Sequence, residues 1–185
     1  MTNSAVRDMA ATESTVRSAA TGDEVAFARL VAEHHASMAR VAFVICGDPE
    51  ATRDAVQCAW AIAWRRMGTL RDPSQVRPWL VAIAANEARQ VIRRRRRQPV
   101  IDISDDLARI GGDPVESLEV VYLRRALRGL NPEERSLLAM RFAAGLDSNE
   151  IAAQLGMSAS GVRSRLARVL ERLRADLAIT PETER

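Results

Sequence analysis

The stretch from Asp147 to Arg174 constrains the fold of this chain more than any other. Asp147 with Glu150 three residues later is a capping box, the signature of a helix start, and the short apolar pattern behind it ends at Gly156. Ser158 is placed to cap a second helix. Apolar side chains recur in that helix at helical spacing: Val162, Leu166, Val169, Leu170, Leu173 and Leu177. The sequence therefore predicts two helices joined by a tight glycine turn.

Polar side chains occupy the side of the second helix opposite this apolar stripe. Two short helices around a glycine turn, with Ser and Arg near the start of the second, have the geometry of a helix-turn-helix that enters a DNA major groove. Hydroxyl and guanidinium groups both donate hydrogen bonds to bases and phosphates. The side chains that we expect to contact DNA are Ser158, Ser160, Arg163, Ser164, Arg165 and Arg168.

Composition and charge favour an all-α chain in two small modules. Aromatic residues make up only 4% of the 185 residues, and helix-forming residues dominate, so we expect no sheet. The net charge of +3 conceals a pattern along the chain. Residues 1–97 carry 15 arginines and 10 acidic residues, residues 98–120 carry 1 and 6, and residues 121–185 carry 11 and 8. Two basic modules thus flank an acidic segment at residues 98–120. This pattern suggests that the two modules bind a polyanion, while the acidic segment contacts a cationic partner or only water.

Several classes of protein are disfavoured by what the sequence lacks. It has no signal-peptide pattern and no apolar run long enough to span a membrane, so we expect a cytoplasmic protein without membrane insertion. The spacing of Cys46 and Cys58 matches no zinc signature, and His34 and His35 have no convergent partners in the sequence. We therefore predict no catalytic residues, no metal site and no cofactor.

The N-terminal part divides into an unpatterned segment and a helix. Residues 1–20 are rich in Ala, Ser and Thr without an apolar stripe, which predicts a disordered segment. From Asp23 an amphipathic helix runs to Gly47. Its apolar stripe consists of Phe27, Leu30, Val31, His34, Met38, Val41 and Ile45, so His34 should face the core.

The next two predicted helices carry distinct polar faces. The helix from Pro49 to about Met67 has a second stripe formed by Glu50, Asp54 and Gln57, which an ordinary solvated face would also show. After a loop over residues 68–78, a third helix extends to about Arg97 and lines up Asn86, Arg89, Arg93, Arg96 and Arg97 opposite its apolar face. Because like charges at this spacing repel, this face favours nucleic-acid binding over simple solvation.

The chain thus divides into a first module at 21–98 and a second at 118–178. Residues 99–117 are acidic, contain Gly111-Gly112 and lack periodicity, so they read as a flexible linker. Helical patterns then lead through Asn131-Pro132 to the helix-turn-helix, which gives the second module about four helices, followed by a tail at 179–185.

Both modules resemble a known family, the extracytoplasmic-function (ECF) group of bacterial RNA polymerase sigma-70 factors. Gly47-Asp48-Pro49-Glu50 with Asp54-Ala55-Val56-Gln57 and Ala63-Trp64-Arg65 is similar to its region 2.2. Arg77-Pro78-Trp79-Leu80 with Ile83-Ala84, Asn86 and the arginine run is similar to regions 2.3 and 2.4. Leu130 to Arg135 and the helix-turn-helix resemble region 4. Two such motifs in this order across a linker are more specific than either alone.

The resemblance implies partners for each surface. In that family the region 2.2 helix docks on the β′ clamp helices of core RNA polymerase, which implies this role for Glu50, Asp54 and Gln57. A loop captures a flipped base of the minus-10 promoter element, and the candidates here are Arg71, Asp72, Ser74 and Gln75. Arg77 is a further candidate for minus-10 binding. Asn86, Arg89 and Arg93 would hold minus-10 phosphates, and the helix-turn-helix would read the minus-35 element. The polymerase β flap and an anti-sigma factor are further implied partners.

We therefore expect a sigma factor that directs core polymerase to promoters and performs no covalent catalysis. The alternative is a helix-turn-helix regulator that acts without polymerase, since such regulators share the second module's pattern. A nuclease is a third class, disfavoured because the sequence shows no carboxylate cluster of metal-site type.

Overall fold

The computed structural model of the protein describes residues 3–97 and 118–179. Within these ranges the chain forms helices and turns but no strand, which confirms the all-α prediction there. The predicted linker over residues 99–117 lies outside the described residues, as does the tail after Ile179.

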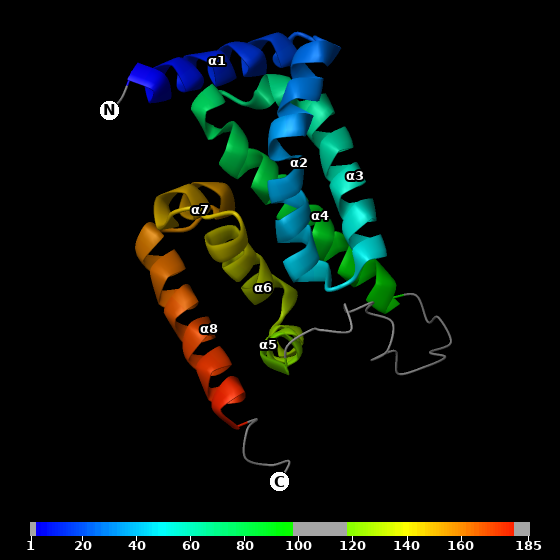
Figure 1. Ribbon diagram of the computed structural model, residues 1–185, viewed down its shortest axis with the longest axis vertical. Coiled ribbons are helices and arrows are strands. Elements are labelled where there is room, and N and C mark those ends of the chain that lie inside the picture. The colour runs from blue at the N-terminus through cyan, green and yellow to red at the C-terminus, as the bar shows by residue number, and fades with distance from the viewer. Residues whose placement is uncertain (1–2, 98–117, 180–185) are drawn as a thin grey trace.

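Three long helices build the first module (Figure 1). They are α2 (Glu24–Cys46), α3 (Pro49–Arg66) and α4 (Val76–Arg97), and each packs against the other two. The Asp23 carboxylate caps α2 by accepting from the amides of Val25 and Ala26, and Gly47 ends it in the left-handed conformation at φ 69°. Two short turns, Met67–Thr69 and Pro73–Gln75, connect α3 to α4.

The prediction of a disordered segment at residues 1–20 is wrong for residues 3–20. Residues 3–20 form helix α1 (Asn3–Ala20), which lies across one end of the α2–α4 bundle (Figure 1). Val16 and Ala19 are buried there, in a cluster that also contains Met67 and Leu80. The buried side of α1 presents small residues in the described part, so it forms no apolar stripe in the sequence, and tertiary packing orders it instead.

Four helices, the number expected from the sequence, make up the described part of the second module, together with a π-helical turn that was not predicted. They are α5 (Leu118–Gly129), α6 (Pro132–Leu138), the turn Ala139–Ala143, α7 (Ser148–Leu155) and α8 (Ala159–Ile179). Capping boxes start α6 at Asn131 and α7 at Asp147. Gly156 ends α7 at φ 63°, a left-handed conformation that favours glycine.

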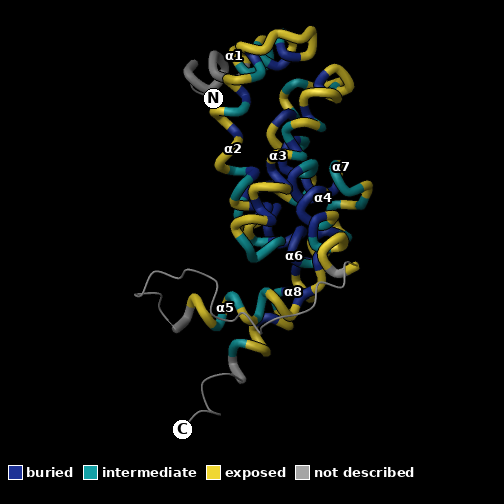
Figure 2. Tube along the Cα trace, turned by 90° about the vertical axis from the view of Figure 1, so that its right-hand side faces the viewer, coloured by how far each residue is buried: buried dark blue, intermediate teal, exposed yellow. Residues whose placement is uncertain are grey.

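The two modules pack against each other over a shared core. One hydrophobic cluster contains Val41 and Val81 of the first module together with Met140 and Ile151 of the second. The π-helical turn lies on α2, and α7 and α6 lie on α4. Figure 2 shows the buried residues concentrated where α4 and α6 meet. Burial of apolar area therefore joins the modules in this structure.

Candidate nucleic-acid interface

The helix-turn-helix is held by hydrogen bonds at both of its helix starts. The Asp147 carboxylate accepts from the amides of Asn149 at 2.7 Å and Glu150 at 2.9 Å, and the Glu150 carboxylate accepts from the Asp147 amide at 2.7 Å. The Ser158 hydroxyl accepts from the amide of Gly161 at 3.1 Å. These bonds satisfy amides that a helix N-terminus leaves unpaired, so they fix where α7 and α8 begin.

The start of α8 presents its polar side to solvent. Val162 is fully buried and Leu166 nearly so, which anchors the opposite side of the helix on the module core. All six side chains predicted to contact DNA from this helix are exposed: Ser158, Ser160, Arg163, Ser164, Arg165 and Arg168. Their exposure leaves these side chains accessible to a partner, and Arg165 and Arg168 also line the cleft described below.

The arginine face of α4 lies against the second module. The Arg93 guanidinium and the Glu133 carboxylate of α6 form an ion pair with Nη2 and Oε1 2.7 Å apart. Arg89 is half-buried beside them. Burial lowers the pKa of Arg89 from its ordinary value, while Glu133 acts in the opposite direction. Asn86 is exposed. Two of the three α4 residues predicted to hold DNA phosphates thus face Glu133.

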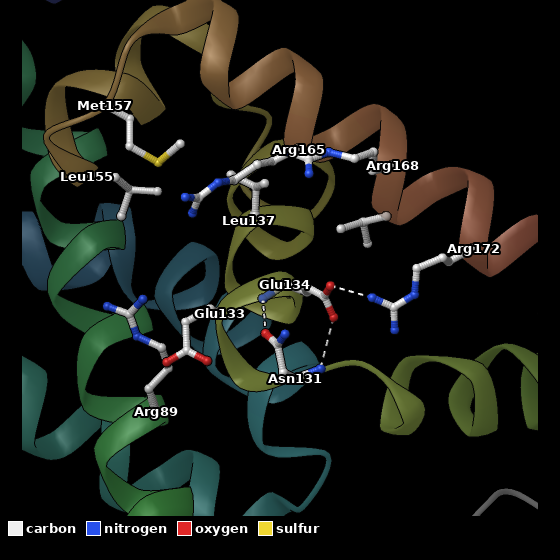
Figure 3. Close-up of a pocket in the computed structure, with 11 residues that line it drawn as sticks. Arg89, Asn131, Glu133, Glu134, Leu137, Leu155, Met157, Arg165, Arg168 and Arg172 are labelled. Atoms are coloured by element: carbon white, nitrogen blue, oxygen red, sulfur yellow. Dashed lines mark hydrogen bonds and ion pairs between the residues drawn. The ribbon is translucent and has the colours of Figure 1, made fainter.

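A cleft of about 590 Å³ opens between α4, α6, α7 and α8 (Figure 3). Arginines from both modules line it, namely Arg89, Arg165, Arg168 and Arg172. Its acidic residues are Glu133 and Glu134, and the Glu134 carboxylate lies 2.5 Å from Nη1 of Arg172. Leu137, Leu155, Met157 and Val169 supply the apolar lining. Residues predicted for the minus-10 and minus-35 elements therefore line one cleft, whose volume suits a small ligand and not a duplex.

The loop before α4 is ordered by its own side chains. The Asp72 carboxylate accepts from the amide of Ser74 at 3.0 Å and from its hydroxyl at 2.7 Å, which forms a local turn. Arg71 is exposed, and Gln75 is half-buried. The Arg77 guanidinium donates to the Ala144 carbonyl of the second module in this structure.

The polar stripe of α3 is accessible. Glu50, Asp54 and Gln57 are all exposed, as the periodicity predicted. Arg95 of α4 lies 3.6 Å from the Glu50 carboxylate and 2.9 Å from that of Asp48, so the stripe's first residue has an internal partner. Trp64 continues the same side of α3 and is 37% exposed.

The residues that sequence reasoning overlooked are Glu133 and Glu134 at the start of α6. Their helix start was recognisable from Asn131-Pro132, and Glu134 is the reciprocal partner in the capping box. Nothing local in the sequence indicates that Glu133 pairs with an arginine 40 residues earlier.

The described residues show no arrangement of metal-site type. Among them, no group of three or more His, Cys, Asp or Glu side chains is placed to hold a metal ion. His34 is 7% exposed, as predicted for a core residue. Cys46 is half-buried, and burial raises the pKa of its thiol to about 11, which keeps the less reactive thiol form. In the same part of the chain, no helix has the length and apolarity to cross a membrane.

Both modules match models of known protein families. Residues 30–98 match sigma-70 region 2, and residues 121–173 match sigma-70 region 4. Together these ranges contain the α3 stripe, the loop and arginine face of α4, and the exposed side of α8.

Proteins of similar sequence are designated RNA polymerase sigma factors. The chain is 33% identical over 168 residues to the "Probable RNA polymerase sigma factor RfaY" of Xanthomonas campestris pv. campestris, which covers 86% of this chain but 42% of that relative's length. It is 30% identical over 178 residues to "RNA polymerase sigma factor NccH" of Alcaligenes xylosoxydans xylosoxydans, covering 91% of this chain and 95% of that protein. It is 29% identical over 152 residues to "ECF RNA polymerase sigma factor SigM" of Mycobacterium tuberculosis, covering 82% and 77%.

A solved structure agrees with the sequence comparisons. The "Structure of CnrH in complex with the cytosolic domain of CnrY" matches with a TM-score of 0.70 and 26% identity, covering 92% of this chain and 99% of that one. Region 2 and region 4 matches in their expected order, with a relative 30% identical over nearly its full length, establish the family. The chain belongs to the ECF group of the sigma-70 family of RNA polymerase sigma factors.

Proposed function

We propose that this chain binds core RNA polymerase, recognises minus-35 and minus-10 promoter elements, and helps open the DNA as a transcription initiation factor. The observation that carries the proposal is that the residues assigned to DNA are divided between the two modules. Arg89 belongs to the region 2 module and Arg165 to the region 4 module, yet both line the cleft in Figure 3. The two sets can meet two separate DNA elements only when the modules move apart.

Binding to polymerase would move the two modules apart. The stripe of Glu50, Asp54 and Gln57 is exposed in the packed structure and is therefore available for a first contact, for which we propose the β′ clamp helices. On α5, Val120, Val121 and Leu123 are 41%, 46% and 45% exposed. Neighbouring exposed apolar side chains on one helix indicate an interaction surface. We propose that this surface of α5 binds the polymerase β flap.

The DNA roles that the family resemblance implies fit the chemistry of each surface. Exposed Ser and Arg side chains at the start of α8 suit major-groove readout of the minus-35 element. The ordered loop at Arg71, Asp72, Ser74 and Gln75 suits capture of a minus-10 base, with Asn86, Arg89 and Arg93 on phosphates. Arg77 joins this set once its bond to the second module is released.

An anti-sigma factor is a further proposed partner, supported by the complex of CnrH with the cytosolic domain of CnrY. Because polymerase and promoters lie in the bacterial cytoplasm, we propose that the protein acts there. We also propose that it is not an enzyme and uses no cofactor, since the assigned roles require only binding.

Reconstitution with purified core polymerase tests the proposal. The protein should comigrate with core enzyme and support run-off transcription from genomic fragments, which also maps its promoter. Asp54→Ala should weaken comigration, because it removes the central side chain of the α3 stripe, and Glu171→Gln on α8 is a charge-matched control. Sequence-specific DNA binding without comigration or transcription would favour the regulator instead. DNA cleavage that depends on a divalent cation would favour the nuclease.

A further inference from the structure

The cleft between the modules in Figure 3 carries more positive charge than its carboxylates neutralise. Both of its acidic residues are already paired, Glu133 with Arg93 and Glu134 with Arg172. The remaining arginines of the lining form no ion pair with a carboxylate of the described residues: Arg89, Arg165 and Arg168. Three positive charges therefore line one cleft without a counter-charge.

These three arginines come from both modules. Arg89 lies on α4 of the region 2 module, whereas Arg165 and Arg168 lie about one turn apart on α8 of the region 4 module. In Figure 3 the side chains of Arg89 and Arg165 extend toward the same space from opposite sides. Like charges held in this way repel, and burial already lowers the pKa of Arg89. An anion bound between them would remove this repulsion.

The rest of the lining suits an organic group. It is formed largely by the apolar side chains of Leu137, Leu155, Met157 and Val169. The volume of about 590 Å³ lies within the range of roughly 300–1,000 Å³ that small-molecule sites occupy. An inorganic phosphate would leave the apolar lining unused. Guanidinium groups bind phosphate oxygens in pairs and also stack on flat rings, so a phosphate chain attached to a base matches both parts of the cleft.

We propose that this cleft binds a nucleoside di- or triphosphate, with Arg89, Arg165 and Arg168 on the phosphates and the base against the apolar lining. Because the arginines belong to both modules, the ligand bridges them and opposes their separation. A ligand that binds only the packed state shifts the equilibrium toward that state. The binding site is independent of the proposed function, and only its effect on polymerase binding rests on that function.

Calorimetric titration of the full chain tests the binding site, at about 0.15 M salt so that exposed charges are screened. The probes are ATP and GTP, with tripolyphosphate and adenosine as the two halves of the ligand. Tripolyphosphate should bind at least about tenfold more weakly than ATP, because it leaves the apolar lining uncovered, and adenosine should not bind detectably. Absence of binding by both ATP and GTP at millimolar concentration overturns the inference. Equal affinities for ATP and tripolyphosphate overturn the assignment to a nucleotide.

Three variants test the bridging position. Arg89→Ala and Arg168→Ala should each weaken ATP binding by about 10- to 100-fold, because each removes charged hydrogen bonds supplied by a different module. Arg174→Ala is the matched control, since Arg174 is exposed on α8 outside the cleft lining, and its loss should change the affinity by less than about twofold. A loss in only one of the two cleft variants, or equal losses in all three, overturns the inference.

Comigration with core polymerase tests the effect on the modules. ATP at about ten times its dissociation constant should lower the apparent affinity of the chain for core polymerase by about tenfold. In Arg168→Ala the ratio of affinities without and with ATP should fall to about one. An unchanged affinity of the unaltered chain with ATP bound overturns the bridging role and the inference with it. Binding of ATP by a chain that neither comigrates nor supports transcription would overturn the proposed function and not the binding site.

Discussion

Arg93 on α4 and Glu133 on α6 form an ion pair across the boundary between the two modules, with 2.7 Å between Nη2 and Oε1. The hydrogen bond from Arg93 holds the pKa of Glu133 below its ordinary value. The two side chains are 57% and 51% exposed, so the pair contributes at most about 1 kcal/mol. The shared apolar cluster supplies most of the attraction between the modules. The ion pair also engages Arg93, one of the residues proposed to contact DNA phosphates.

Removing this ion pair should improve DNA binding by the free protein. Glu133→Gln releases Arg93 and should raise the affinity for promoter duplex by up to about fivefold at low salt. Fluorescence anisotropy with a labelled promoter fragment measures the change. The contribution of Glu133 is present above the ordinary carboxylate pKa and is lost as the pH falls through the lowered value, so the comparison belongs at neutral pH.

Glu171→Gln controls for the change in net charge, because it removes one exposed negative charge from α8 without touching α4. An equal gain in affinity for both variants would show that overall charge, and not release of Arg93, is responsible.

His34 should make stability depend on pH. Burial lowers its pKa from the ordinary value, Glu33 raises it, and Arg77 lowers it further. No hydrogen bond from the described residues reaches Nε2 of His34. Since the folded-state pKa is the lower one, stability is complete above the unfolded-state pKa near 6.5 and decreases as the pH falls through the interval between the two values. Each unit of difference corresponds to about 1.4 kcal/mol.

Urea unfolding at pH 7.5 and 5.5 measures this effect. His34→Leu, which keeps an apolar side chain in the buried site, should flatten the dependence between these values. A variant that retains the full pH dependence would assign it to other groups.

Helix α1 should contribute to stability in proportion to its buried contacts. Val16 is 2% exposed, and Val16→Ala should lower the free energy of unfolding by about 2 kcal/mol through lost burial and a residual cavity. Val25→Ala is the matched control, because Val25 is 65% exposed and its loss should cost less than about 0.5 kcal/mol. Equal effects in chemical denaturation would argue against packing of α1 on the bundle.

Arg165 should contribute one phosphate contact to minus-35 binding. Arg165→Ala in the holoenzyme should weaken the complex and reduce the slope of log affinity against log salt by about 0.9. Arg174→Ala, an exposed arginine nearer the end of α8, should leave the slope unchanged. An unaltered slope for Arg165→Ala would remove this residue from the phosphate contacts.

Sequence patterns located the helix starts because their signals are local. The capping box at Asp147, the left-handed turn at Gly156 and the burial of His34 agree with the structure, since each depends on residues within a few positions along one helix. Helix α1 was missed for the same reason. Its buried Val16 and Ala19 are too small and too few to form a visible stripe, so only the cluster with Met67 and Leu80 identifies them as core.

The sequence by itself determined the helices from α2 onward, the order of the two modules and the faces that carry arginine and polar side chains. Only the tertiary structure decided that Arg93 pairs with Glu133, that Arg77 reaches Ala144, and that Arg89 and Arg165 line one cleft. Helical periodicity depends on neighbours within a few residues, whereas these two contacts and the shared cleft bring together residues 40 to 76 positions apart. An arginine face has the same sequence pattern whether its partner is a phosphate or a glutamate, so packing alone reveals the partner.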